Sequence, residues 1–265
     1  MKMSIQTGLA ALALTFMAAE AAAVQGVITM PNGSKREGDI KWVVRDKVYS
    51  IVEKGRPIEM QLKPDEIADL QIPRPRELDA AIESIRQGNA AAAVPVLEKL
   101  AADYLMLQWD KPATRYLAEA HVQAGNADKA IAVCEKVIAA NPEAAYLGEM
   151  APAYWQALIK RERLSKVEDL ISKAIKTGDR LASANALIAR GDLVQAAGDT
   201  AEIAKKALRD GYLRVITLYK SERAAQPEAL FKAAKCFEKL GQTQRADQLR
   251  TTLKGEFGSS EWAKK

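Results

Sequence analysis

Histidine and cysteine are the scarcest reactive residues in this 265-residue chain, which has one histidine, His121, and two cysteines, Cys134 and Cys236. No two of the three have the close paired spacing of a zinc site, and one histidine would have to serve any Ser-His or Cys-His pair. The glycines are isolated and form no Gly-rich loop of the kind that cradles phosphates. The sequence therefore predicts a chain that is not an enzyme and has no cofactor or metal.

The first 23 residues have the pattern of a secretory signal peptide. Lys2 supplies the positive start, Gly8–Ala19 form an apolar run, and either Ala19-Glu20-Ala21 or Ala21-Ala22-Ala23 offers small residues for cleavage. The run is too short to span a bilayer comfortably, and no cysteine lies near the cleavage site. We expect a soluble mature chain without a transmembrane helix, exported to a bacterial periplasm.

Residues 24–75 differ in composition from the rest of the chain, with short β-branched runs separated by turn residues such as Pro31-Asn32-Gly33-Ser34. The predicted strands are 24–30, 38–44, 48–52, 57–62 and 67–72. A helical turn at Pro64-Asp65-Glu66 is expected before the fifth strand. This order resembles a small five-stranded SH3-like β-barrel, and its limited size suggests that it packs on the next segment.

Residues 76–265 show a repeated spacing of small and apolar residues, clearest between Pro112 and Pro142. In that segment Ala118 and Ala130 allow close helix approach, Gly125 ends one helix, and Pro142 ends the next. The pattern resembles the tetratricopeptide repeat, a helix–turn–helix unit of about 34 residues that stacks into an α-solenoid. In that family His121 takes a position that usually holds a packed tyrosine, so we expect it in the core.

A second good copy has the same register near the end of the sequence, with Leu230, Ala233, Ala234, Phe237, Gly241, Ala246 and Leu253. The segment that begins at Phe257 resembles the closing phrase of bacterial cell-envelope repeat proteins, such as the periplasmic tetratricopeptide protein of the Tol–Pal system. Weaker copies bring the expected number of helix pairs to about five. Pro95 is expected to distort the first of them, and the fourth needs a long second helix that reaches about Tyr219. An irregular helical bundle is the alternative fold.

A stacked repeat places its first helices along a concave groove that suits an extended peptide or a helix of a partner. By resemblance to the family, the groove-facing residues would be Arg115, Glu119, Val122, Gln156, Phe231, Lys235 and Glu238. These expectations describe a non-catalytic cell-envelope scaffold that binds a protein partner. The alternative is a cell-wall or glycan-binding β domain, with Trp42 and Tyr49 exposed and the repeats as a rigid spacer.

The chain has a net charge of +5, and residues 200–265 hold 14 Lys and Arg against eight Asp and Glu. This basic excess favours acidic partners, so an anionic wall polymer is a further candidate ligand beside a protein or peptide. Nucleic acid fits poorly with an exported protein. Cys134 and Cys236 fall in repeats that are not neighbours, so both are expected as buried thiols rather than as a disulfide.

Overall fold

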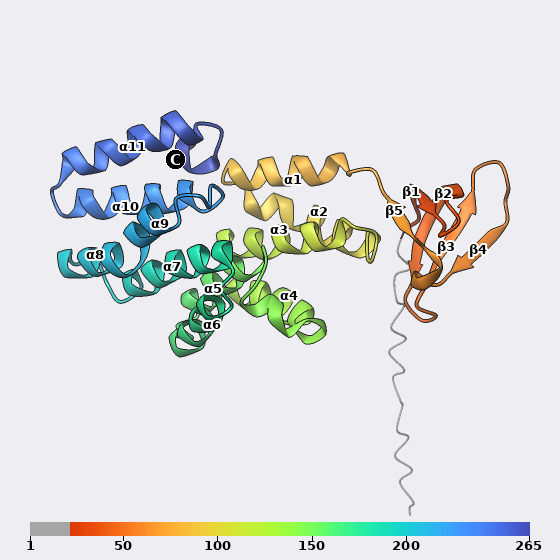
Figure 1. The fold of residues 1–265 in the computed structure, drawn as a ribbon, viewed down its shortest axis with the longest axis horizontal. Helices are drawn as coiled ribbons and strands as arrows, with labels where there is room; N and C mark the ends of the chain where they lie inside the picture. Colours follow the sequence, from red (N-terminus) through yellow and green to blue (C-terminus); the bar gives the residue numbers. More distant parts are fainter. Residues whose placement is uncertain (1–21) are drawn as a thin grey trace, which may run out of the picture.

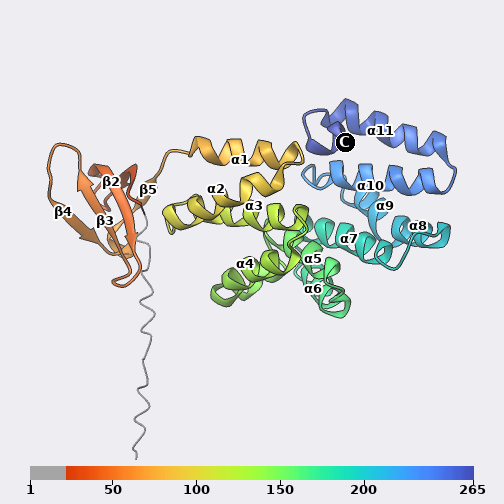
Figure 2. The ribbon, with the colours of Figure 1, turned by 180° about the vertical axis from the view of Figure 1, so that it is seen from behind.

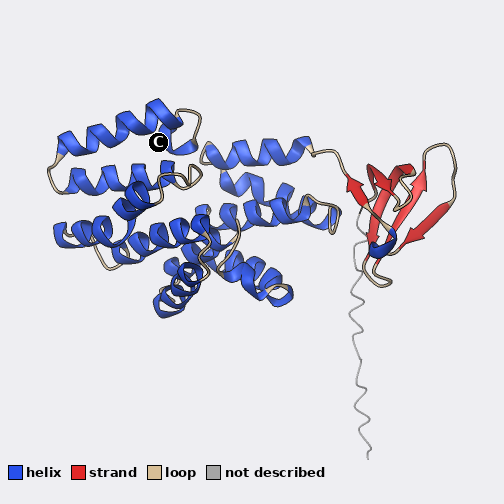
Figure 3. Cartoon of the chain, viewed as in Figure 1, coloured by secondary structure: helices blue, strands red, loops and turns tan. Residues whose placement is uncertain are grey.

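The computed structural model describes residues 22–265, in which an antiparallel β-sheet is followed by a region whose regular elements are all helical (Figure 3). The sheet lies at one end of the helical region in both views (Figures 1 and 2). Most of the predicted signal peptide, residues 1–21, lies outside the described residues. The mainly helical fold class, with a small five-stranded β domain before a helical repeat region, is confirmed.

The five strands form one sheet in the order β4-β3-β2-β1-β5. They are β1 (Val24–Thr29), β2 (Lys35–Val43), β3 (Val48–Glu53), β4 (Glu59–Leu62) and β5 (Asp69–Gln71), with the one-turn helix η1 (Pro64–Glu66) before β5 as predicted. The sheet is not closed, so the predicted SH3-like barrel is not confirmed. Closure would need hydrogen bonds between β4 and β5, but these short strands lie at opposite edges and pair only with β3 and β1.

One face of the sheet carries a small apolar core. Ile28, Ile40 and Ile51 of the three central strands are fully buried, and Leu62 and Ile72 extend this core towards its edges. Alternation of side chains along each strand brings the residues to the same face. A core of this size gives a small sheet little stability of its own, so the face needs a second surface to pack against.

That second surface is the loop of residues 104–109, which leads from the first helix pair to the second. Leu107 is completely buried in the core of the sheet. The indole Nε1 of Trp109 donates to the carbonyl oxygen of Ile72 at 2.9 Å, and the Gln108 Oε1 accepts from the Ile72 N–H at 3.0 Å. The predicted packing of the β domain on the repeats therefore occurs, through a loop rather than through a helix face.

Five helix pairs follow the sheet, in agreement with the predicted number. The first three are α1 (Arg76–Arg86) with α2 (Ala90–Asp103), α3 (Asp110–Gln123) with α4 (Ala127–Ala140), and α5 (Ala151–Lys160) with α6 (Leu164–Lys176). In the fourth, α7 (Arg180–Gln195) packs on the continuous run of α8 (Ala201–Ala207), η3 (Leu208–Tyr212) and α9 (Leu213–Leu218). The fifth is α10 (Gln226–Lys239) with α11 (Thr243–Phe257). Short helices η2 (Pro142–Ala145) and η4 (Glu261–Lys264) follow α4 and α11.

The small residues of the second pair lie where the repeat pattern predicts them. Ala118 and Ala130 are both fully buried and belong to one apolar core with α5 and α6. Gly125 joins α3 to α4 with a φ of 80°, a left-handed conformation that side chains other than glycine rarely adopt. The predicted register of this pair is therefore confirmed.

Pro95 does not break the first pair in the way that the sequence suggested. It lies inside α2, which runs without interruption from Ala90 to Asp103. A proline in this position lacks the N–H that would bond to the carbonyl one turn earlier. The burial of Ala93 and Leu97 beside it keeps this stretch helical through tertiary packing.

The fourth pair contains the long second helix that the sequence predicted, and a π-helical turn, η3, accommodates extra length. Gly191 lies inside α7. A Cβ atom on Gly191 would lie 2.4 Å from the ring of Tyr212, and one on Gly211 would lie 2.7 Å from the Gly191 backbone. The two glycines thus let α7 and η3 approach more closely than side chains would permit.

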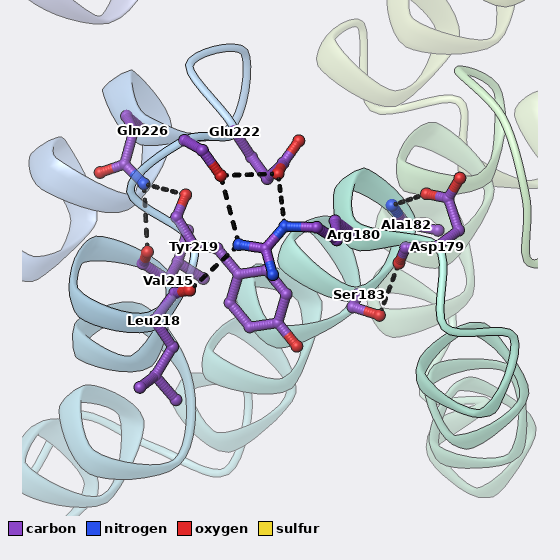
Figure 4. A network of polar contacts seen from close by, with 10 residues as sticks. Asp179, Arg180, Ala182, Ser183, Val215, Leu218, Tyr219, Glu222 and Gln226 are labelled. Atoms are coloured by element: carbon purple, nitrogen blue, oxygen red, sulfur yellow. Dashed lines mark hydrogen bonds and ion pairs between the residues drawn. The ribbon is translucent and has the colours of Figure 1, made fainter.

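A polar network fixes the far end of this pair, where α9 stops and the chain turns towards α10 (Figure 4). The Arg180 guanidinium donates to Glu222 Oε1 at 2.9 Å and to the Leu218 carbonyl oxygen at 3.3 Å, and lies over the Tyr219 ring. Gln226 donates to the Tyr219 carbonyl oxygen at 2.9 Å. Because a helix end leaves carbonyl groups without helical partners, these contacts satisfy the end of α9.

Candidate functional site

Two of the expected groove residues lie on α3 and are partly covered. The guanidinium of Arg115 pairs with Glu149 Oε2 at 3.1 Å and lies 4.5 Å from the centre of the Tyr116 ring. Glu119, one turn later, is half-buried and accepts a hydrogen bond from Gln123 Nε2 at 3.2 Å. Both side chains therefore stay close to the surface of the second pair, where their charges can act on a neighbouring segment.

Val122 does not fit the expected groove, and Glu238 is engaged by a neighbouring helix. Val122 is only 3% exposed and packs in the core shared with α5 and α6, so it cannot contact a partner. Glu238 is exposed, but its carboxylate pairs with Arg250 of the neighbouring helix α11. An error of one position in helical phase turns a residue by about 100°, which moves it from the groove to the core or to the adjacent helix.

The expected residues of α10 and α5 are better placed. The ring of Phe231 is half-buried and packs on the ring of Trp262 with centroids 5.3 Å apart. Lys235 is exposed, and its ammonium lies 4.4 Å from the centre of the Phe231 ring. Gln156 is half-buried on α5. Phe231 and Lys235 therefore form a mixed aromatic and cationic surface on one side of α10.

A charged network that sequence reasoning missed lies beside this surface, between α7 and α10. The Lys232 ammonium pairs with Asp192 Oδ2 at 2.6 Å and with Glu228 Oε1 at 2.5 Å, and each of the three side chains is less than 20% exposed. The Tyr212 hydroxyl donates to the other Asp192 oxygen at 2.7 Å. Each of the four residues thus has a specific polar partner in a largely buried place.

The environment of this network shifts the ionisation of its members. Burial alone would lower the pKa of Lys232, but the carboxylates of Glu228 and Asp192 raise it above its ordinary value. Burial raises the pKa of Glu228, and the Lys232 charge opposes that rise. Burial and the Asp192 carboxylate also raise the pKa of Tyr212. At neutral pH the ammonium is therefore firmly held between the two acidic side chains.

The pKa of Glu119 on α3 depends on charges that belong to the fifth pair. Its pKa is raised, first by burial and then by the carboxylate of Glu261, with a further contribution from Glu228, while Arg115 and Lys265 oppose the rise. Glu119 belongs to the second pair, whereas Glu228 and Glu261 belong to the fifth pair and the segment after it. Charges of the second and fifth pairs, which have two pairs between them along the chain, thus act on one another.

The sequence contained a signal for part of this network. Glu228 and Lys232 are four residues apart, the spacing of a helical ion pair, and precede the expected residues Phe231 and Lys235 by three positions. Their pairing with Asp192 depends on how α7 packs against α10, which no local spacing reveals. Trp262 lies beyond the last regular repeat, where the repeat pattern assigns no position.

The reactive side chains lie in the core rather than in the groove. Cys134 and Cys236 are fully buried free thiols, as predicted, and burial raises the pKa of Cys134 to about 12 and that of Cys236 to about 11. His121 is 2% exposed, and burial lowers its pKa. Within residues 22–265 no three His, Cys, Asp or Glu side chains gather in a way that could hold a metal ion.

None of the helices in residues 22–265 has the length and apolar character required to cross a membrane.

Comparison with known proteins identifies the repeats. Tetratricopeptide repeat models match residues 84–151 and residues 228–254. Two crystal structures of a Podosopora anserina putative kinesin light chain with nearly identical TPR-like repeats also align, each with 18% identity and a TM-score of 0.35. The alignments cover 70% and 68% of this chain and 96% and 92% of the other chains. No curated protein matches. Tetratricopeptide repeats are thus found in two segments of this chain.

Proposed function

We propose that this chain is a non-catalytic, periplasmic scaffold that binds a protein partner in the groove between α3, α7 and α10. The observation that carries the proposal is the aromatic and cationic surface of Phe231 and Lys235 on α10, with the charged network of Asp192, Glu228 and Lys232 beside it. Taking charges out of water is costly, and apolar residues of similar volume often stabilise such sites equally well. Retained charge in a groove is better explained by recognition of a partner than by stability.

Export to the periplasm is supported by the sequence pattern before Val24 and by the similarity of the last segment to periplasmic repeat proteins of the Tol–Pal system. The measurement is mass spectrometry of the natural protein after cell fractionation. We expect a mature start between about residue 22 and residue 25 in the periplasmic fraction, since small residues precede that point. Cytoplasmic material with Met1 intact would remove this part of the proposal.

Partner binding is tested by affinity recovery from cell-envelope extract with the double variant Phe231→Ala and Lys235→Ala. The matched control is Lys136→Ala with Lys160→Ala, two exposed lysines on α4 and α5. Loss of a central aromatic residue of an interface commonly costs about 2 kcal/mol or more of binding free energy. We expect the groove variant to lose recovery at unchanged helical content, and equal recovery by both variants would contradict the groove.

The β domain offers less support for the alternative function of wall or glycan binding. The Tyr49 hydroxyl donates to the carbonyl oxygen of Met106 at 3.2 Å, and the Trp42 and Tyr49 rings pack edge-on at 4.8 Å. Tyr49 is thus committed to the contact with the loop of residues 104–109. If the double variant Phe231→Ala and Lys235→Ala still recovers the partner and also cosediments with purified peptidoglycan, the binding surface lies on the sheet rather than in the groove.

A further inference from the structure

The groove of the fifth pair is already occupied by a segment of the same chain, residues 258–265, which we name the closing segment. After α11 ends at Phe257 the chain turns, and η4 packs against both α10 and α11. The Ser260 side chain accepts from the Ala263 N–H at 3.2 Å and begins this short helix. The turn and its hydrogen bond direct Trp262 onto the groove side of α10.

Trp262 is the main contact of the closing segment. Its ring packs against Phe231 at 5.3 Å, with the ring planes inclined at 47°. The ammonium of Lys232 lies 5.7 Å from the ring centre, and that of Lys265 lies 3.8 Å from it. An aromatic side chain between cations and another ring gains quadrupole interactions beyond simple burial. This surface of α10 is therefore an aromatic-binding site, and Trp262 fills it.

The closing segment lies on the surface that the proposed function gives to a partner. Trp262 contacts Phe231 and Lys232 on α10, and the charges of Glu261 and Lys265 also act on the pKa of Glu119 on α3. A bound peptide that contacts Phe231 would therefore take the position of this segment.

The charges of the closing segment fit the groove imperfectly. Glu261 adjoins Trp262, whose ring lies 5.7 Å from the Lys232 ammonium, and that single ammonium is already shared by the carboxylates of Asp192 and Glu228. The charge of Glu261 adds to this excess of carboxylates and contributes to the raised pKa of both Glu119 and Glu228. Within the closing segment, the ammonium of Lys265 pairs with the carboxylate of Glu261 at 3.8 Å, and each charge partly neutralises the other. A peptide with a basic residue in the place of Glu261 would meet the same two carboxylates with attraction.

We propose that the closing segment is an internal ligand of the groove, and that the partner displaces it with a peptide in which a basic residue precedes a tryptophan or another large aromatic residue. The inference rests on the proposed function and specifies the partner chemistry of that site. The aromatic residue takes the place of Trp262 on Phe231, and the basic residue faces Glu119 and Glu228. The closing segment then competes with every partner for the same site, so a partner must bind the groove tightly enough to displace it.

The experiment uses the full chain with Trp262→Ala and two labelled octapeptides, followed by fluorescence anisotropy. One peptide has the sequence of residues 258–265, and the other has lysine in the place of Glu261. A tethered competitor has a local concentration in the millimolar range, so the unchanged chain should bind either peptide about tenfold more weakly than the variant. The lysine peptide should bind the variant several-fold more tightly, and that preference should shrink as salt is added.

The controls separate this site from other effects. Lys264→Ala changes an exposed residue of the same segment and should leave peptide binding as it is in the unchanged chain. Phe231→Ala added to Trp262→Ala should abolish binding. If Trp262→Ala disturbs folding, Glu261→Lys provides a second test, because a better closing segment should weaken the binding of added peptide several-fold.

A folded Trp262→Ala chain that binds neither peptide, or that binds no better than the unchanged chain, would overturn the proposal, as would equal affinity for the two peptides. These failures would leave recovery of the envelope partner unaffected, so the proposed function would stand. Peptide binding as expected, without recovery of a partner by any variant, would instead confirm the internal ligand and contradict the scaffold.

Discussion

Two segments outside the regular repeat pattern pack on the helix pairs in different ways. The loop of residues 104–109 joins the sheet with a completely buried Leu107 and with neutral hydrogen bonds from Trp109 and Gln108. The closing segment lies on α10 through a half-buried Trp262, among cations and opposed carboxylates. Apolar burial with satisfied hydrogen bonds suits a permanent joint, whereas a small and electrostatically mixed contact suits one that opens.

The largest expected loss of stability comes from the contact between the sheet and the loop of residues 104–109. Leu107→Ala removes a fully buried side chain between the sheet and the helices and should lower the free energy of unfolding by about 2–5 kcal/mol. Met106→Ala, at an exposed neighbour, is the control and should change stability by less than about 0.5 kcal/mol. Urea unfolding followed by circular dichroism measures both. A loss as small as that of the control would show that the contact of the sheet with residues 104–109 stabilises the fold no more than the closing segment does.

The loss of stability caused by a substitution inside a repeat should lie between the losses expected at the loop of residues 104–109 and at the closing segment. Ala130→Trp forces a large ring into a position with no exposed surface and should lower the free energy of unfolding by about 1–3 kcal/mol through overpacking. Differential scanning calorimetry gives the transition temperature. An unchanged transition would contradict the close approach of α3 and α4 at this residue.

Trp262→Ala should cost less than either of these substitutions, about 1 kcal/mol, because it removes one aromatic pair and cation contacts that are partly open to water. The same urea experiment measures it. Stability falling as far as in Leu107→Ala would mean that the closing segment is a structural part of the fifth pair, and its displacement by a partner would then be excluded.

The smallest expected effect is a dependence on pH. The pKa of Glu119 in the folded chain is raised above its ordinary value of 4.5 by burial and by Glu261. A raised pKa contributes stability that is present at low pH and is lost as the pH rises through the folded value. We therefore expect Glu119→Gln to become more stable relative to the unchanged chain as the pH increases above 4.5. Denaturation at a series of pH values checks this, and a constant or decreasing difference would place Glu119 away from the carboxylates.

The sequence predicted those elements whose signals are local. Gly125 and the alanines of the second pair mark a repeat because close packing and a left-handed turn restrict residue choice at the same spacing each time. The strands of the sheet follow from turn residues and alternation. The SH3-like barrel is not confirmed, because closure depends on whether β4 meets β5 in space, and nothing in either strand encodes that meeting.

The groove was predicted less well than the fold. Phe231 and Lys235 lie on the face that carries Trp262, but Val122 is turned into the core by a small difference in helical phase. Asp192 and Lys232 come together only through the packing of α7 on α10. Within the fourth pair, Gly191 and Gly211 set how closely α7 approaches η3. These relations are properties of tertiary packing rather than of residue spacing.

The joint at residues 104–109 has a mechanical consequence for the whole chain. Because the sheet is attached to the loop between α2 and α3, and its backbone is bonded there through Ile72, its orientation follows the angle between the first two helix pairs. A solenoid that flexes when a groove is filled changes such angles between neighbouring pairs. Any change in the angle between the first two pairs would therefore change the position of the sheet relative to the rest of the repeats.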